Sequence, residues 1–311
     1  MVALSRRAVI EGCEGELSVE YLVVYNGDRV GPVEWAARRE GEGWSGLAMA
    51  DHVSSGRTGA WHPFAALGAM AVVTTRVSLT TAYANNLMRS PVEYAQAALS
   101  LHALSGGRFQ VGLGAGWAKG EIIASGLEYP TSRERAQRFR EAVIIVRQLL
   151  RGPCRHDGDH YQIDLAAAGP PADPPPVLAA ALGGPWTIKH IAPLLDRIEI
   201  NPAGAAIRGG RLDLAILAGT TPDDVRSLIG RAREANPDAQ IGLGVFVAAG
   251  EGPMVDAMKA GFGDGFAAGL AGSPKQVADH VTALGDYGVD RVTLVPLVPA
   301  SIDLLAPVLL T

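Results

Sequence analysis

The sequence predicts a single (β/α)8 barrel that spans all 311 residues. Short runs rich in Val, Ile and Leu alternate eight times with segments of helical periodicity, which is typical of a buried parallel sheet. Hydrophobic residues make up 48% of the chain and charged residues only 19%, which indicates a large core. Because α/β barrels commonly exceed 250 residues as one domain, the length requires no second domain.

The eight apolar runs are expected to form the parallel strands of this barrel. Strands of this kind are covered on both faces, so they read as nearly continuous apolar stretches rather than alternating ones. The predicted strands are 20–25, 46–50, 77–82, 109–113, 177–182, 197–200, 241–247 and 291–295.

Helices are expected between the strands, and three are clear. Residues 132–150 carry apolar side chains every three or four positions, with Ser132 as the expected N-cap. Residues 91–104 start with a proline and are followed by Ser-Gly-Gly, which match the preferred start and stop residues of a helix. Residues 273–284 open with Ser-Pro.

Residues 152–176 and the glycine-rich residues 248–272 interrupt the regular alternation, and residues 201–220 are long and irregular. Residues 160–163 are strand-like and are expected to form a hairpin over the barrel mouth, where insertions commonly shape substrate access. Residues 212–217 lie in the irregular stretch after the sixth strand, and we interpret them as an extra short strand.

Composition excludes several classes of function. The net charge is −5 and the basic residues are scattered, which argues against nucleic acid as a partner. No apolar run is long enough for a membrane span, and the first 20 residues lack the apolar core of a signal peptide, so we expect a cytoplasmic protein. Cys13 and Cys154 are too few and too far apart for a disulfide framework.

Asp51 and His52 directly follow the predicted second strand. In a barrel, that position lies at the catalytic face. Histidine exchanges a proton near neutral pH, and a neighbouring carboxylate can fix its tautomer or contact a ligand. A capping or loop pair is the alternative interpretation of the same dipeptide.

Glycines follow two other strands. Gly114, Gly116 and Trp117 come after the fourth strand, where glycine lets a planar ligand approach the backbone, although a structural turn explains them equally. A dinucleotide fingerprint is excluded because Trp117 stands where its last glycine is needed. After the fifth strand, the segment Gly183-Gly184-Pro185-Trp186 opens a helix, and free amides at such a position attract phosphate.

A cluster of possible metal ligands lies in one short stretch. The spacing matches no usual zinc pattern, and Asp-Gly within it favours a hairpin turn, so we expect a solvated loop and no metal. The residues concerned are Cys154, His156, Asp157, Asp159 and His160.

In combination, these motifs closely resemble the luciferase-like monooxygenase superfamily. The likeness covers most of the chain in order and spacing, and it weakens between about 200 and 270. It rests on Ala50-Asp51-His52, Thr80-Thr81-Ala82-Tyr83-Ala84-Asn85, Arg89-Ser90-Pro91, Leu104 to Phe109, Gly112 to Trp117 with Glu121, Glu134 to Glu141, Gly272-Ser273-Pro274 and Gly288 to Val292.

The resemblance implies a barrel that binds FMN or the deazaflavin coenzyme F420. It would place the cofactor's phosphate at Gly183, Gly184, Pro185 and Trp186, and its ring against Thr80, Thr81 and Ala82, where the family often has a non-proline cis peptide. The further predicted cofactor contacts are Asp51, Asn85, Gly114, Gly116 and Trp117.

The Asp51-His52 pair and the Gly-Ala-Gly-Trp sequence look most like the deazaflavin-dependent branch. The resemblance therefore implies hydride transfer between reduced F420 and a small organic substrate with a C=C, C=N or C=O bond, or the reverse oxidation of an alcohol. His52 would be the proton partner and Asp51 mainly a cofactor contact. Trp61, Tyr83 and Trp117 are the expected walls of the pocket.

Three further points follow from the resemblance. Trp117 and Gly120 replace the acidic residue and asparagine of the sugar-phosphate dehydrogenases, which argues against glucose 6-phosphate as substrate. An FMN-dependent monooxygenase that uses oxygen is the alternative function, and a non-catalytic barrel that binds no flavin is the third. Because many members are dimers, a homodimer is compatible with the resemblance.

Overall fold

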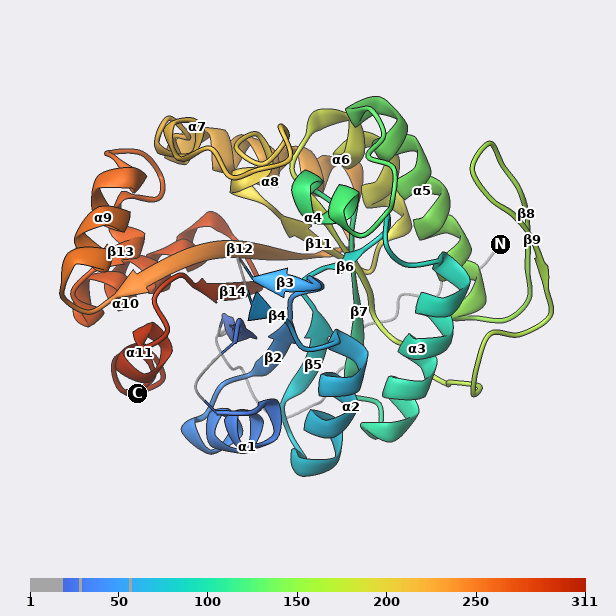
Figure 1. The fold of residues 1–311 in the computed structure, drawn as a ribbon, viewed down its shortest axis with the longest axis horizontal. Helices are drawn as coiled ribbons and strands as arrows, with labels where there is room; N and C mark the ends of the chain where they lie inside the picture. Colours follow the sequence, from blue (N-terminus) through green and yellow to red (C-terminus); the bar gives the residue numbers. More distant parts are fainter. Residues whose placement is uncertain (1–18, 28–29, 56–57) are drawn as a thin grey trace.

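Eight parallel strands close into a barrel in the computed structural model of the chain, which describes residues 19–27, 30–55 and 58–311 (Figure 1). Closure is complete because β10 pairs with both β7 and β11, and β14 pairs with both β1 and β12. The predicted fold class is confirmed, and each predicted strand is present within two residues of its expected bounds. The barrel strands are β1 (Glu20–Tyr25), β2 (Gly46–Met49), β5 (Ser78–Thr81), β7 (Phe109–Gly114), β10 (Leu178–Leu182), β11 (Arg197–Ile200), β12 (Gln240–Ala249) and β14 (Arg291–Pro296).

Helices surround the barrel (Figure 1). Seven of the helices in the described part of the chain begin at a proline, whose fixed φ suits the first helical position and whose missing N–H is not needed there. The helices are α1 (Pro32–Glu42), α2 (Pro63–Val73), α3 (Pro91–Leu104), α4 (Lys119–Ala124), α5 (Ser132–Leu149), α6 (Pro185–Ile191), α7 (Leu214–Ala218), α8 (Pro222–Ala235), α9 (Pro253–Phe262), α10 (Pro274–Ala283) and α11 (Ser301–Leu309).

Side-chain caps fix where several helices start. The Ser273 hydroxyl accepts from the backbone N–H of Gln276 at the start of α10, and the Gln276 side-chain oxygen accepts from the backbone N–H of Ser273. The N-cap of α5 is Thr131, whose hydroxyl accepts from the N–H of Glu134, so the predicted cap Ser132 is wrong by one residue. Both residues can cap a helix, and the backbone bend falls at the earlier one.

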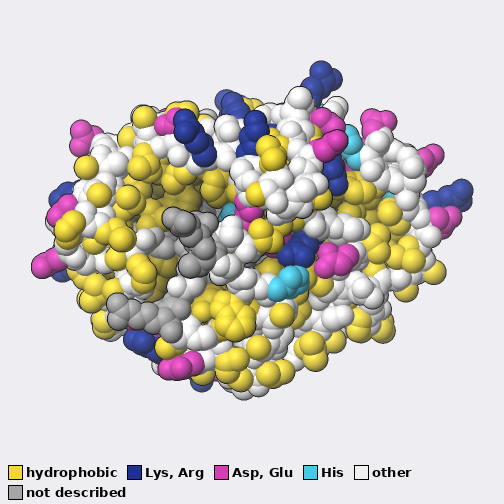
Figure 2. Space-filling view, viewed as in Figure 1, with side chains coloured by type: hydrophobic (Ala, Val, Ile, Leu, Met, Phe, Trp, Pro, Cys, Tyr) yellow, Lys and Arg dark blue, Asp and Glu magenta, His cyan; other side chains and the backbone are white. Residues whose placement is uncertain are grey.

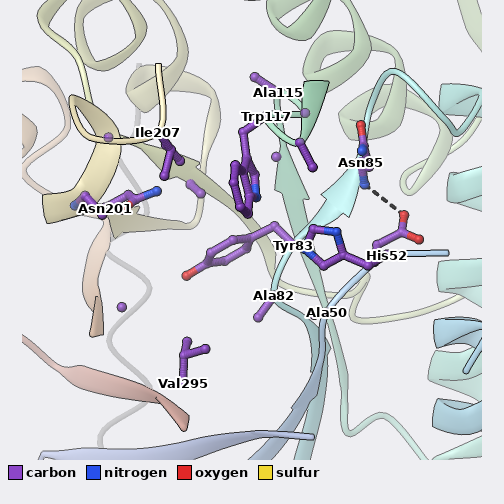
Figure 3. Close-up of a pocket in the computed structure, with 18 of the residues that line it drawn as sticks. Ala50, His52, Ala82, Tyr83, Asn85, Ala115, Trp117, Asn201, Ile207 and Val295 are labelled. Atoms are coloured by element: carbon purple, nitrogen blue, oxygen red, sulfur yellow. Dashed lines mark hydrogen bonds between the residues drawn. The ribbon is translucent and has the colours of Figure 1, made fainter. Parts of the chain in front are cut away.

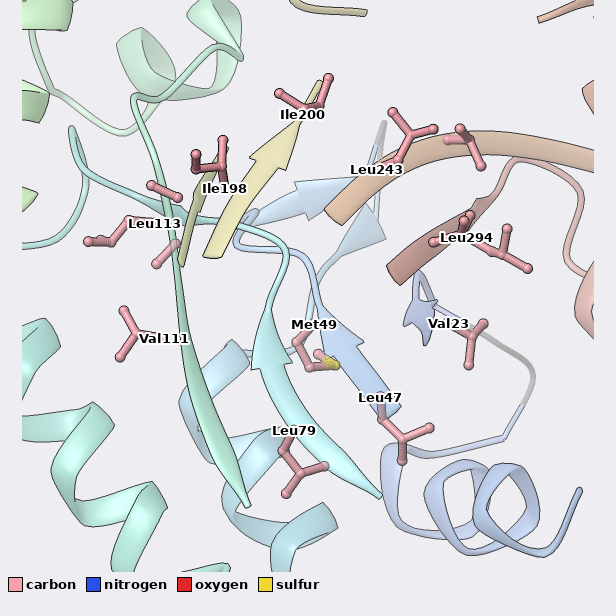
Figure 4. Close-up of a cluster of buried hydrophobic side chains, with 14 of the residues drawn as sticks. Val23, Leu47, Met49, Leu79, Val111, Leu113, Ile198, Ile200, Leu243 and Leu294 are labelled. Carbon is pink, nitrogen blue, oxygen red and sulfur yellow. The ribbon is translucent and has the colours of Figure 1, made fainter. Parts of the chain in front are cut away.

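The main apolar core lies between the outer face of the barrel and the helices. Figure 4 shows strand side chains that point away from the barrel axis toward this layer. All are at most 3% exposed, which explains why the strands read as apolar runs. They include Val23, Leu47, Met49, Leu79, Val111, Leu113, Ile198, Ile200, Leu243 and Leu294.

The inside of the barrel carries charge. The Arg197 Nε donates to Oε1 of Glu199 at 2.6 Å, and both side chains are at most 4% exposed. Gly242 makes room for this carboxylate, since a Cβ there would lie 2.0 Å from Oε2 of Glu199. Arg291 donates to Glu20 on β1 and to Gln110 on β7, so one guanidinium connects three strands.

Two predictions about the irregular segments are wrong. Residues 212–217 do not form a strand, because Asp213 caps the short helix α7 by accepting from the amides of Ala215 and Ile216. The predicted hairpin exists, with β8 (Cys154–Asp157) antiparallel to β9 (Gln162–Leu165). It packs beside α5 at the periphery, however, and not over the mouth (Figure 1).

None of the described helices is both long and apolar enough to pass through a membrane. Cys13 and the first 18 residues, on which the expected absence of a signal peptide depends, lie outside the described residues.

The remaining short elements connect the barrel strands and the helices. They are β3 (Ser54–Ser55), β4 (Thr58–Gly59), β6 (Ala84–Asn85), β13 (Ala271–Gly272), η1 (Ala192–Leu194), η2 (Pro202–Gly204), η3 (Ala268–Leu270) and η4 (Leu284–Tyr287).

Candidate active site

A large cavity opens at the carboxyl ends of the barrel strands. Its volume is about 1030 Å³, and residues from all eight barrel strands or the loops that follow them line it. Figure 2 shows hydrophobic side chains gathered around the hollow on this face. Because the ends of several strands meet here, this is the face at which barrel enzymes hold their catalytic groups.

His52 stands in the cavity wall just after β2 and pairs with a carboxylate. Its Nδ1 lies 2.7 Å from Oε2 of Glu121, and its ring meets the Trp117 ring edge to face at 5.7 Å. The His52 side chain is 29% exposed, whereas that of Glu121 is 8% exposed. Nε2 of His52 makes no hydrogen bond to the described residues, so it is the nitrogen available to a ligand (Figure 3).

Sequence reasoning missed Glu121 as a partner of His52. It was part of the family motif but received no role, because nothing in the sequence connects positions 69 residues apart. It lies in the first turn of α4, and its other oxygen accepts from the amides of Val53 and Ser54. Glu121 therefore orients the His52 ring and also holds the chain that follows it.

Asp51 is fully engaged inside the protein. Its carboxylate accepts from Nε and Nη2 of Arg89 at 3.2 and 2.9 Å and from the backbone N–H of Asn85 at 2.9 Å. The hydrogen bond to Asp51 raises the pKa of Arg89. Asp51 lines the cavity, but its side chain has no exposed area. The Asp51–Arg89 ion pair and the bond to Asn85 fix the loop after β5 beside His52.

The segment after β5 is only partly in the cavity. Ala82 lines it, and the Ala82–Tyr83 peptide bond is cis, as the resemblance led us to expect in this loop. Thr80 and Thr81 do not line the cavity. Thr81 instead donates to the carbonyl of Gly112 at 2.6 Å inside the protein. The two threonines lie in β5 itself, before the residues of this segment that line the cavity.

Tyr83 connects the cavity floor to the charged interior of the barrel. Its hydroxyl donates to Oε2 of Glu199 at 3.5 Å, and its ring lies below Trp117 (Figure 3). Burial, followed by the negative charge of Glu199, raises the pKa of Tyr83 well above its ordinary value. The phenol is therefore neutral at any working pH and acts as a donor to Glu199.

Of the glycines after β7, Gly116 lies close to another part of the same chain. Gly116 has a φ of +81°, and a Cβ at this position would lie 2.4 Å from Oδ1 of Asn85. Gly114 and Trp117 line the same wall as Asn85. Together these residues present backbone and one aromatic side chain to the cavity.

The segment after β10 forms the neighbouring wall, because β10 pairs with β7. Gly183, Gly184, Pro185 and Trp186 all line the cavity. Gly183 packs on backbone, because a Cβ there would lie 2.9 Å from the carbonyl oxygen of Asn201 and from Cα of Gly204. The predicted helix after this segment is present as α6, continued by η1.

The candidate metal ligands lie away from the cavity. In the part of the chain that the structure describes, no group of three or more His, Cys, Asp or Glu side chains could hold a metal ion. His156 instead meets Oε2 of Glu141 at 3.2 Å, and that carboxylate also accepts from the amides of Asp159, His160 and Tyr161. This cluster fastens the β8–β9 hairpin to α5.

Similar proteins have been found by sequence. An F420-dependent glucose-6-phosphate dehydrogenase of Amycolatopsis mediterranei is 35% identical over 164 residues, which are 51% of this chain and 49% of the relative. One with the same name from Mycobacterium avium is 30% identical over 224 residues, 68% of this chain and 66% of the relative. In the first relative, the match spans about half its length.

Solved structures share the fold. An F420-dependent secondary alcohol dehydrogenase in complex with an F420–acetone adduct superposes with a TM-score of 0.72 at 20% identity, over 93% of this chain and 98% of that one. A monooxygenase from Streptomyces bottropensis gives a TM-score of 0.70 at 18% identity, over 94% and 96%. The sequence model described as luciferase-like monooxygenase matches residues 31–255, and the chain therefore belongs to the luciferase-like monooxygenase family.

Proposed function

We propose that this protein is an oxidoreductase that transfers a hydride between coenzyme F420 and a small organic substrate. The observation that carries the proposal is the His52–Glu121 pair, which presents one ring nitrogen to a large cavity at the catalytic end of the barrel. The names of the relatives from Amycolatopsis mediterranei and Mycobacterium avium, both F420-dependent, support the choice of cofactor.

The residues present fit a flat cofactor with a phosphate. Gly114, Gly116 and Ala82 leave backbone where side chains would obstruct a planar ring, and a Cβ at Gly116 would strike Asn85. We place the ring against these residues and Trp117. We place the phosphate at Gly183 and Gly184, with Pro185 and Trp186 beside it, because glycine lets an anion reach the backbone amides.

The chain supplies orientation and a proton. Reduction of a C=C, C=N or C=O bond takes up a hydride, which a reduced deazaflavin supplies when bound, and a proton, which His52 supplies from Nε2. Glu121 holds Nδ1 of the ring as a hydrogen-bond donor, which directs the exchangeable position of His52 into the cavity. In the direction of alcohol oxidation, the same nitrogen accepts the proton.

Asp51 then has a supporting role. Because both of its oxygens are bound to Arg89 and to the amide of Asn85, we propose that it positions the loop under the ring. Thr80 and Thr81 support the same loop from within the barrel and, in this arrangement, do not contact the cofactor.

An FMN-dependent monooxygenase is the second candidate, since monooxygenases are among the structures with the same fold. A fluorescence and absorbance titration with oxidised F420 and with FMN separates the two. We expect F420 to bind at least tenfold more tightly, which is ~1.4 kcal/mol. Tight binding of FMN alone would contradict the proposal, and binding of neither cofactor would support a non-catalytic barrel.

A further inference from the structure

Two arginines in the cavity lining have no carboxylate partner. Arg135 lies near the start of α5, and Arg208 lies in the stretch that follows η2. Among the described residues, no carboxylate oxygen lies within 4.0 Å of a nitrogen of either guanidinium. The carboxylates of the lining are engaged elsewhere, since Asp51 binds Arg89 and Glu121 binds His52. The cavity therefore holds positive charge that its own wall does not neutralise.

Neutral groups hold the Arg135 guanidinium in place. Its Nη1 donates to the carbonyl of Pro130 at 2.9 Å and its Nη2 to the hydroxyl of Ser132 at 3.5 Å. The guanidinium carbon lies 4.3 Å from the centre of the Tyr129 ring. Its Nε is buried and has no hydrogen-bond partner among the described residues, and the whole residue is only 8% exposed. Because little water surrounds this cation, its charge acts on the cavity with little screening.

Lys119 and Arg208 lie on the outer side of the same ring. Lys119 opens α4, and its Nζ is 5.8 Å from the centre of the Tyr129 ring. Gly210 packs on both residues, since a Cβ there would lie 2.4 Å from Cβ of Lys119 and 3.3 Å from the Tyr129 hydroxyl. The turn that contains Arg208 therefore lies against Lys119. We call Lys119, Arg135 and Arg208 the cationic corner; its first and last members are exposed to solvent.

The cationic corner adjoins the segment proposed for the phosphate. A Cβ at Gly204 would lie 2.8 Å from Cα of Gly183, so η2, which leads to Arg208, packs directly on that segment. Gly183, Gly184 and Arg208 line the same cavity. An anionic group held at the corner is therefore attached to a ligand close to its phosphate and not at the reacting bond beside His52.

We propose that the cationic corner binds the glutamate carboxylates that coenzyme F420 carries beyond its phosphate. This rests on the function proposed above and names a further contact of the same cofactor. In coenzyme F420 the phosphate is followed by lactate and a chain of glutamates, whereas FMN ends at its phosphate. With the phosphate at Gly183 and Gly184, the acidic tail leaves the cavity past Arg208, and opposite charges attract it there. The corner then favours F420 over FMN.

The test compares two forms of the oxidised cofactor by fluorescence titration in low salt. One form carries the glutamate tail, and the other ends at the lactate. We expect the tailed form to bind about tenfold more tightly, which is ~1.4 kcal/mol. The difference should shrink in about 0.5 M NaCl, because salt screens charges at the surface. Equal affinity of the two forms in low salt overturns the inference.

Variants locate the contact. Arg208→Gln is expected to remove most of the advantage of the tailed form and to change the affinity for the lactate form by less than about twofold, since an exposed charge contributes little beyond its direct partner. Arg208→Lys should keep most of the advantage. Arg231→Gln is the matched control, because Arg231 is exposed on α8 and does not line the cavity. Equal weakening of both forms in Arg208→Gln assigns Arg208 to the phosphate and contradicts the inference.

Failure of the proposed function and failure of the inference give different results. If neither form of F420 binds the native protein, the proposed cofactor is wrong, and the tail contact falls with it. If both forms bind with the same affinity, F420 remains the cofactor and only the tail contact is wrong. A tail advantage that survives in Arg208→Gln also leaves the function intact and overturns the inference.

Discussion

His52 and Glu121 form one hydrogen-bonded pair although one follows β2 and the other lies in α4. Glu121 contacts both the imidazole and the two amides that follow it, so the same carboxylate sets the ring's orientation and the path of the chain. Orienting carboxylates of this kind are common where a histidine must present a single nitrogen to a ligand.

We expect His52→Ala to bind F420 with nearly unchanged affinity and to turn over about 100-fold more slowly, because a general acid or base contributes roughly that much. Stopped-flow oxidation of reduced F420 by a substrate with a C=C, C=N or C=O bond measures the rate, and fluorescence measures cofactor binding. His160→Ala is the control, since His160 lies in the turn of the β8–β9 hairpin and outside the cavity lining. Equal losses in both variants would remove His52 from the mechanism.

The β8–β9 hairpin shows how one carboxylate can fasten an element. Glu141 on α5 accepts from His156 and from three successive backbone amides in the hairpin turn. Burial opposes the charge of Glu141, but the hydrogen bonds from His156, His160 and Tyr161 outweigh it, and the pKa of Glu141 falls below its ordinary 4.5.

The hairpin should therefore loosen in acid. Because the pKa of Glu141 is lower in the folded protein than in the unfolded chain, its stabilising effect is complete above pH 4.5 and is lost as the pH falls through the lowered value. Hydrogen exchange at the amides of Asp159 to Tyr161 measures this. In Glu141→Gln the same amides should exchange faster already at pH 7. If their protection in the native protein does not change between pH 6 and 3, the interpretation is wrong.

Across the whole molecule, the sequence predicted the fold better than it predicted contacts. The strands were found because Leu47, Leu79 and Leu243 face the helices and make each run apolar. The charged barrel interior was missed, since Arg197 and Glu199 within so short a run gave no sign that both side chains point inward. The placement of the hairpin was missed because pairing between two strands does not specify what they pack against.

For the candidate site, too, the sequence predicted the residues better than the contacts between them. Asp51, His52 and the glycines were predicted, because each stands directly after a strand whose end must reach the catalytic face. The His52–Glu121 pairing was not, since it depends on how α4 lies beside the loop that follows β2. Asp213 offered a signal that went unused, because aspartate before an apolar run is also the start signal of a helix.

The charged barrel interior predicts a stability effect far from the cavity. Glu199→Ala leaves the buried guanidinium of Arg197 without its carboxylate and should lower the free energy of unfolding by ~3 kcal/mol, as breaking a buried ion pair does. Urea unfolding followed by circular dichroism measures it. Glu234→Ala on α8 is the control, as an exposed residue. A loss below 1 kcal/mol would show that the pair contributes little.

The bond from Tyr83 to Glu199 has a consequence for laboratory evolution of this barrel. The apolar side chains around the mouth, such as Phe246 and Val295, can be exchanged to accept new molecules without disturbing the charged layer below. Tyr83 cannot, because it belongs both to the cavity floor and to the layer that holds the strands together. Libraries that keep Tyr83 and vary the mouth should retain far more folded members than libraries that randomise both.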